Sequence, residues 1–313
     1  MAIITMKKSK KGIYLALLAA FISGVSIFLN KYAVDAIKQP LVFTSIKNTG
    51  VAMLLVTTVI MSGKWKKILN LGKNELWKLF LIGVIGGSIP FYLFFTGLSQ
   101  TPAVNGAIIQ KTLIIWVAIL AWPLLKEKMS FKKTALVALL FGANLLVGGF
   151  KGFKFSQGEG LILLATLFWA IETIIVKKAL VKIDPVILVT ARMGIGSIIL
   201  LIMSAVLQPV ALNKVVNLSI NQWFWIILTM ITLFGYVTSW YTALKHASAT
   251  SVMAILVGST LVTNILSAVF ITHSFNGLMM IQTLTMVVGI AILSRIEIKS
   301  GLDSIESKLS PII

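Results

Sequence analysis

The sequence contains no cysteine and very few acidic or imidazole side chains. Without cysteine, neither a disulfide nor a thiolate metal site can form. Nine Asp and Glu residues and two His residues leave little from which to build a metal cluster or a hydrolytic triad. We therefore expect no metal, no cofactor and no enzyme activity. Charged residues are only 12% of the chain, whereas a soluble domain carries about a quarter.

Apolar side chains are what the sequence has in abundance. They make up 58% of the 313 residues, and the mean hydropathy is +0.98. This is more apolar surface than a soluble core can hold, so we predict that the solvent is a lipid bilayer. The net charge of +19 would suggest nucleic acid as the partner of a soluble protein, but in a membrane protein it fits loops that face the cytoplasm and anionic lipid. The expected partners are the bilayer and a small molecule, with no nucleic acid.

Apolar windows long enough to cross a membrane occur ten times along the chain. Each has about 19–24 residues, which matches a hydrocarbon core of about 30 Å. The windows are 12–34, 41–62, 76–98, 103–125, 131–149, 158–181, 186–207, 221–244, 249–272 and 275–294. The first follows the run KKSKK, as a signal peptide would, but it is too long and lacks a small-residue cleavage site, so we predict a helix there.

The distribution of lysine and arginine predicts the orientation. With the N-terminus inside, twenty Lys and Arg side chains fall on the inner side of the membrane and five on the outer side. The outer five are Lys31, Lys38, Lys151, Lys154 and Lys214. This bias predicts a multi-pass protein of the cell membrane with both termini in the cytoplasm.

The two halves of the chain resemble each other at an offset of 146 residues. LLAAFISGVSIFLNKYA at 17–33 aligns with LLATLFWAIETIIVKKA at 163–179, and at an offset of 145 Pro40 meets Pro185 and Lys47 meets Arg192. Five windows per half is an odd number, so the second half enters the membrane from the opposite side. The prediction is an all-α membrane protein of ten transmembrane helices, arranged as two inverted five-helix repeats around a central cavity.

Two stretches with loose sequence motifs carry a family resemblance. They are PLLKEKMSFKKTALVALLFGANLLVGG at 123–149 and FYLFFTGLSQTPAVNGAII at 91–109, and the second recurs as SWYTALKHASATSVMAIL at 239–256. Over residues 12–296 the chain resembles the drug/metabolite transporter superfamily, in its ten-helix EamA-type branch. The resemblance implies a ten-helix bundle that moves small metabolites or drugs. The second copy departs from the pattern, with His273 where another glutamate is usual.

These observations divide the chain into five predicted segments. They are a cytoplasmic basic N-terminus (1–11), a first repeat (12–149), a linker and hinge region (150–157), a second repeat (158–294) and a polar cytoplasmic tail (295–313).

Four charged residues lie at membrane depth. At 1.5 Å per residue, Lys47 and Lys111 lie roughly 10–12 Å from the outer surface, and Glu172 and Arg192 lie roughly 20 Å down. Charges at such depth face a bundle interior or a water-filled cavity and have a partner. We therefore expect Glu172 and Arg192 to pair, either to hold two helices together or to serve the site. Lys47 and Lys111 either face the cavity or extend to the interface.

Residues that share this depth complete the candidate substrate site. The full set is Lys111, Lys47, Glu172, Arg192, Trp169, Trp240, Tyr241, Asn30, Gln110 and Asn264. Glu172 is also the candidate for proton coupling, because it is the only acid deep enough to bind a proton during a transport cycle. The amides have interhelical hydrogen bonding as their alternative role, and the aromatic residues have an interfacial position as theirs.

Three cations against one anion favour a substrate that carries a carboxylate or phosphate. We therefore predict a secondary transporter that exports small polar metabolites such as amino acids or organic acids by alternating access. The alternative is a proton-coupled exporter of drugs or quaternary cations that uses Glu172. An enzyme is disfavoured, since no nucleophile–base set or phosphate-binding loop is present. A monomer and a homodimer both fit the sequence.

Overall fold

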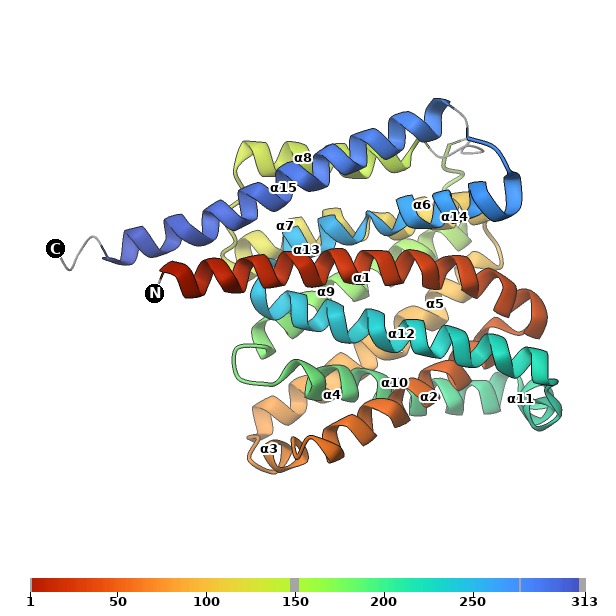
Figure 1. Cartoon of the computed structure of the whole chain (residues 1–313). Coiled ribbons are helices and arrows are strands. Elements are labelled where there is room, and N and C mark those ends of the chain that lie inside the picture. The colour runs from red at the N-terminus through yellow and green to blue at the C-terminus, as the bar shows by residue number, and fades with distance from the viewer. Residues whose placement is uncertain (1, 147–151, 276, 310–313) are drawn as a thin grey trace.

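The structure, a computed structural model, describes residues 2–146, 152–275 and 277–309. Every regular element in this part of the chain is a helix, and none is a strand, so the all-α prediction is confirmed. The long helices lie side by side as a bundle, and both ends of the chain lie at the same end of it (Figure 1). We call this the terminal end, and the other the opposite end.

The described part of the first half forms eight helices. They are α1 (Ala2–Ile37), α2 (Pro40–Met61), α3 (Trp65–Leu69), α4 (Lys73–Gly87), α5 (Ile89–Leu98), α6 (Ala103–Lys111), α7 (Leu113–Leu125) and α8 (Phe131–Asn144). Their starting points follow ordinary rules. Pro40 begins α2 at a position where its missing N–H is not needed, and the Ser130 hydroxyl accepts a hydrogen bond from the backbone N–H of Lys133 at the start of α8.

The second half has a similar series of helices. They are α9 (Gln157–Ala179), α10 (Pro185–Leu207), α11 (Pro209–Asn213), η1 (Lys214–Asn217), α12 (Ile220–His246), α13 (Ala249–Leu256), α14 (Ser259–Ser267), the π-helical η2 (Ala268–Thr272) and α15 (Gly277–Leu309). Serine or aspartate caps the start of four of them: Ser156, Asp184, Ser219 and Ser248.

Nine helical stretches among the described residues are long and apolar enough to cross a membrane. They correspond to all the predicted windows except 131–149. That window contains α8, which ends at Asn144, and residues 147–149 lie outside the described residues. The predicted linker at 150–157 lies partly outside them as well, at 150 and 151, and its part from 152 to 156 is not helical.

Three windows that we predicted as continuous helices are broken instead. The breaks fall at Ser88, at Thr112 and at Val257–Gly258. Pro90 accounts for the first, because its ring and missing N–H interrupt a helix that arrives from the preceding turn. The other two are equivalent in the repeat, since Thr112 and Gly258 are 146 residues apart. The fourth window of each half is therefore a broken helix.

The segment from 295 onward, predicted as a polar cytoplasmic tail, is helical in its described part. The helix α15 continues to Leu309 without interruption, and Glu297 is only 7% exposed. The N-terminal segment is also helical, as the first part of α1. The apolar windows end where charged residues begin, but the helices at this end continue beyond that point.

Close contact between the two halves depends on glycine at one crossing. The carbonyl oxygen of Gly87 on α4 lies 2.5 Å from where a Cβ at Gly196 on α10 would stand. Any side chain there would force the two helices apart. Small residues at such a crossing let two helix backbones approach closely.

Candidate functional site

Glu172 and Arg192 form an ion pair in the interior of the bundle. Glu172 lies on α9 and Arg192 on α10, and Arg192 Nε donates to Glu172 Oε1 over 2.6 Å. Glu172 is 0% exposed and Arg192 is 4% exposed. The predicted pairing is therefore confirmed. Because the charges are buried, removing either one would leave its partner uncompensated in an apolar environment.

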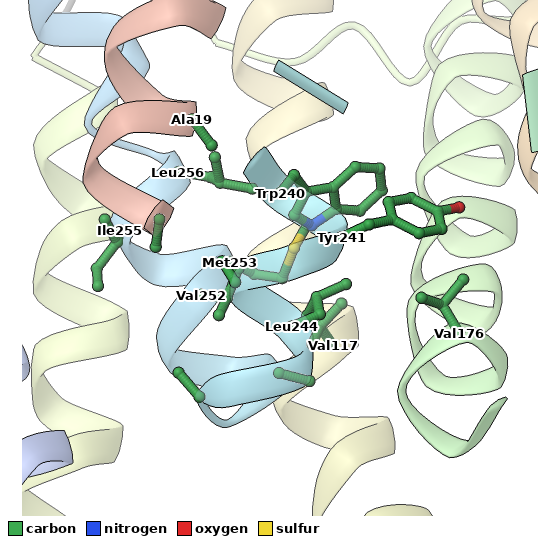
Figure 2. Close-up of a cluster of buried hydrophobic side chains, with 14 of the residues drawn as sticks. Ala19, Val117, Val176, Trp240, Tyr241, Leu244, Val252, Met253, Ile255 and Leu256 are labelled. Carbon is green, nitrogen blue, oxygen red and sulfur yellow. The ribbon is translucent and has the colours of Figure 1, made fainter. Parts of the chain in front are cut away.

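Tyr241 completes the coordination of the same carboxylate oxygen. It lies on α12, and its hydroxyl donates to Glu172 Oε1 over 2.5 Å. Figure 2 shows the Tyr241 hydroxyl extended toward the helix that carries Val176, which is α9. The other carboxylate oxygen, Oε2, is buried and has no hydrogen-bond partner in the described structure. A buried acceptor without a partner is a place where a ligand or proton could bind.

Glycine provides the space for this carboxylate. A Cβ added at Gly86, at the end of α4, would overlap the Glu172 carboxylate. The backbone of Gly86 also accepts a hydrogen bond from Trp169 Nε1 over 3.2 Å. Gly86 therefore serves two members of the candidate site: its lack of a side chain leaves room for Glu172, and its carbonyl oxygen binds Trp169.

Aromatic rings cover the guanidinium of Arg192. Its central carbon lies 5.7 Å from the ring centre of Phe91 and 5.5 Å from that of Trp240. Tyr236 stacks on Trp240 with a centroid distance of 5.7 Å. Trp240 Nε1 is a second buried polar atom without a partner in the described residues. Phe91 and Tyr236 were absent from the sequence-based set.

Lys47 is buried on α2, 8% exposed, against neutral groups. Its ammonium donates to Asn30 Oδ1 over 3.1 Å and lies 4.6 Å from the centre of the Phe43 ring. Asn30 in turn contacts Ser26 through its Nδ2 at 3.4 Å. In this conformation the Lys47 side chain lies between helices.

Lys111 ends α6 next to one helix break and contacts the other. Its ammonium donates to the hydroxyl of Ser259 over 3.2 Å, and Ser259 is the first residue of α14. The neighbouring Thr112 contacts Thr166 on α9, with 3.2 Å between the two hydroxyl oxygens. Glu172 is six residues further along α9, which corresponds to about 9 Å along the helix axis. Lys111 thus lies in a layer nearer the opposite end than the Glu172–Arg192 pair.

The remaining candidates are distributed around this centre. Asn264 on α14 donates to Gln282 Oε1 on α15 over 2.8 Å, so it bridges two helices in the second half. Gln110 is half-buried on α6, beside Lys111. The structure brings Glu172, Arg192, Tyr241, Trp240 and Trp169 together, and it does not place Asn264 among them by any described contact.

Two hollows lie away from this centre. One, of about 380 Å³, is lined by residues 122, 123 and 126–128 at the end of α7. The other, of about 630 Å³, lies where α2 begins and α10 ends. Neither is lined by Glu172 or Arg192. Glu172, Arg192 and Tyr241 are each at most 4% exposed, so the candidate site is closed in this conformation. Within the described residues, no group of three or more His, Asp or Glu side chains could hold a metal ion.

One family profile matches both halves of the chain, and known proteins resemble much of its length. The family profile described as "EamA-like transporter family" matches residues 10–149 and again 156–295. An uncharacterized transporter of Archaeoglobus fulgidus is 28% identical over 197 residues, which are 60% of this chain and 66% of that protein, just under two thirds of its length. The uncharacterized transporter YyaM of Bacillus subtilis is 28% identical over 67% of this chain and 70% of its own.

A solved crystal structure extends the likeness to the whole fold. It superimposes with a TM-score of 0.72 over 90% of this chain and 97% of its own, with 13% sequence identity. At that identity the likeness concerns the fold alone.

Proposed function

Because the chain belongs to the EamA-like transporter family and is a membrane transporter, we propose that it exports small polar metabolites such as amino acids or organic acids. The two inverted halves would rock around the centre formed by Glu172 and Arg192, so that the centre opens first to one side of the membrane and then to the other. The terminal end would face the cytoplasm of the cell, in agreement with the excess of lysines on that side.

The observation that carries this proposal is the unequal charge of the buried layers. Arg192 is neutralised by Glu172, but the partners described for Lys47 and Lys111 are the neutral groups Asn30 and Ser259. A substrate that brings a carboxylate or phosphate would supply the missing counter-charge. The anionic group would bind Lys111 in the outer layer, and the aromatic rings around Arg192 would contact the rest of the substrate.

A multidrug or quaternary-cation exporter is the second candidate, because one oxygen of Glu172 has no described partner. A cation could bind there. Against this, the other oxygen already accepts from Arg192 and Tyr241, so the carboxylate is not a free negative charge. An added cation would also lie close to the guanidinium, and like charges in a low-dielectric site repel strongly.

The proton would move in the same direction as an anionic substrate but in the opposite direction to a cationic one. If the anionic group passed from Lys111 to Arg192 during the cycle, it would displace Glu172, and the buried carboxylate would then take up a proton. A cation that binds Glu172 would instead compete with that proton. Co-transport with a proton thus accompanies the first class, and exchange for a proton accompanies the second.

Transport by purified protein in liposomes tests the proposal. We would compare saturable uptake of amino acids, dicarboxylic acids, sugar phosphates and quaternary amines, with and without a pH gradient. Uptake of the anionic or zwitterionic probes is expected, and Lys111→Met should reduce it at least about tenfold, since one charge-assisted hydrogen bond is lost. Lys214→Met is the matched control, because Lys214 is exposed on η1.

Two results would contradict this assignment. Saturable uptake of quaternary amines alone, abolished by Glu172→Gln, would establish the cation exporter. Normal anion uptake by Lys111→Met would show that the Lys111 ammonium serves the structure and not the substrate.

A further inference from the structure

A polar cluster, buried at Lys133 and Glu297 and half-buried at Glu127 and Lys177, joins the two halves at the terminal end of the bundle. Its charged members are Glu127 at the end of α7, Lys133 on α8, Lys177 on α9 and Glu297 on α15. All four contact residues 244–251, which comprise the end of α12, the short connection and the start of α13. The sequence-based set did not include any of them, because each lies at the edge of an apolar window.

Glu297 is the centre of the cluster. Its carboxylate accepts hydrogen bonds from Ser248 N over 2.7 Å, from Ser248 Oγ over 2.8 Å and from Ser251 Oγ over 2.6 Å. Lys133 Nζ lies 3.4 Å from the same carboxylate and donates to Ser248 Oγ over 2.9 Å. Both charged side chains are less than one tenth exposed. Charge-assisted bonds of this kind are about twice as strong as neutral ones.

Glu127 and Lys177 hold the two helix ends that meet at this connection. Glu127 accepts from the backbone N–H groups of Ala249 and Thr250 over 2.5 and 3.2 Å, at the positive end of the α13 dipole. Lys177 donates to the carbonyl oxygens of Leu244 and Ala247 over 2.5 Å each, at the negative end of α12. Each charge thus lies at the helix end that favours its sign.

The bonds made by Glu127 and Lys133 cross from the first half of the chain to the second, whereas those of Lys177 and Glu297 to residues 244–251 lie within the second half. Any rocking motion that separates the halves at this end must break the bonds of Glu127 and Lys133. The contact therefore depends on the conformation of the whole bundle.

The repeat keeps one member of the cluster at the opposite end, since Lys177 corresponds to Lys31, but it does not reproduce the other three. At the offset of 146, Glu127 corresponds to His273, Lys133 to Met279 and Glu297 to Lys151. The sequence thus places no acid at the positions equivalent to Glu127 and Glu297. His273 is exposed in the structure. The two ends of the bundle therefore differ in this charge arrangement.

We propose that Glu127, Lys133, Lys177 and Glu297 form the gate at the terminal end, which holds that end closed and biases the resting protein toward opening at the opposite end. The proposal rests on the alternating-access function above. Opening the terminal end would expose the α12–α13 connection and would separate Lys133 from Glu297. Because the equivalent positions at the opposite end lack this charge arrangement, closing that end does not recover the lost bonds.

The chain has no cysteine, so a single introduced cysteine can be labelled without background and its labelling rate can report on the gate. Ala249 is 0% exposed beneath Glu127, so a cysteine placed there should react slowly with a membrane-impermeant maleimide. The reagent is added to purified protein in nanodiscs. In the Ala249→Cys background, Lys133→Met and Glu297→Gln should each raise the labelling rate at least about tenfold, because charge-assisted bonds of the closed state are lost. Ser251→Ala, which removes a single bond to Glu297, should give a smaller increase.

Matched controls separate gating from general loosening. Lys182→Met removes an ion pair of the same length, 3.4 Å to Glu75, whose lysine is 73% exposed, and it should leave the labelling rate unchanged. A cysteine at the exposed Lys67 should react rapidly in every background. Thermal unfolding of each variant shows whether it is folded at the labelling temperature, and Ser251→Ala retains every charge if a charge-removing variant does not fold.

The outcomes distinguish the gate from the transport proposal. Unchanged labelling of Ala249→Cys in the folded variants would overturn the gate, even if the protein transports metabolites. Faster labelling without transport of any anionic probe would support the gate and would refute the substrate class. Faster labelling in Lys182→Met as well would show nonspecific loosening and would also overturn the gate.

Discussion

Replacement of Glu172 or Arg192 should destabilise the protein far more than replacement of both. Glu172→Gln leaves the guanidinium of Arg192 in a site that is 4% exposed, with aromatic rings on it and no counter-charge. Removing one partner of a buried pair typically costs about 3–5 kcal/mol. The glutamine oxygen can still accept from Arg192 and Tyr241, so we expect about 3 kcal/mol for this variant. Arg192→Met should cost somewhat less, because the stranded carboxylate can take up a proton.

The double variant Glu172→Gln/Arg192→Met should recover most of this loss. Neither charge remains, the side-chain volumes are nearly kept, and Tyr241 can still donate to the glutamine. A buried pair replaced in this way is often neutral to stability, so we expect a value within about 1 kcal/mol of the wild type. Transport should fail in all three variants if the charges serve the substrate.

Equilibrium unfolding in mixed detergent micelles, followed by the fluorescence of the eight tryptophans, measures these differences. The four proteins form a double-mutant cycle, and the coupling between the two sites is the quantity of interest. A double variant as unstable as Glu172→Gln alone would refute the reasoning, as would a loss below about 1 kcal/mol in that single variant. Full transport by the stable double variant would show that the pair is structural.

Further predictions concern the space that Gly86 leaves for Glu172 and the pH dependence of the Asp184–Lys64 ion pair. Gly86→Ala places a methyl group on the Glu172 carboxylate, so we expect a loss of about 1–3 kcal/mol and of transport, whereas Gly142→Ala on α8 meets no atom within 4 Å and should be neutral or stabilising in the same unfolding and uptake assays. Burial raises the pKa of Asp184, but its hydrogen bond with Lys64, 3.0 Å away, the hydrogen bond from the backbone N–H of Val186 and the charge of Lys64 together more than offset this, and the pKa is lowered. Asp184→Asn should therefore destabilise at pH 7 by up to about 1 kcal/mol, and unfolding measured against pH should show that difference fading below about pH 4 and vanishing below the lowered pKa. A difference that persists at the lowest pH would mean that the lost interaction is not ionic.

The depth of a charge could be predicted from the sequence, but its direction around the helix could not. Helix rise is constant, so counting residues placed Glu172 and Arg192 at one level and predicted their ion pair. Tyr241 lies on α12, which is apolar on nearly all sides, and such a helix carries no periodic signal for the face that points inward. Its bond to Glu172 therefore emerged only from the structure.

Charges at the ends of apolar windows were assigned to loops for a related reason. Hydropathy declines where lysine and glutamate begin, and a charge there usually contacts water. Lys133 and Glu297 are buried because they meet each other and the start of α13 across 164 residues of sequence. A long-range pairing of this kind leaves no local pattern. The helix break at Ser88 had a visible cause in Pro90, whereas the break at Thr112 had none.

The paired breaks at Thr112 and Gly258 have a mechanical consequence. They divide two membrane-spanning helices into shorter helical segments, so one segment can tilt about the break while the other stays in place. The helix α13 has eight residues and is about 12 Å long, so a tilt of about 20° around Gly258 would displace its first turn by about 4 Å. Glu127 accepts a hydrogen bond from that first turn, and Lys111 donates a hydrogen bond to Ser259, next to the break at Gly258. A ligand that binds Lys111 would thus act beside Gly258, and a small displacement there would become a larger displacement at the first turn of α13.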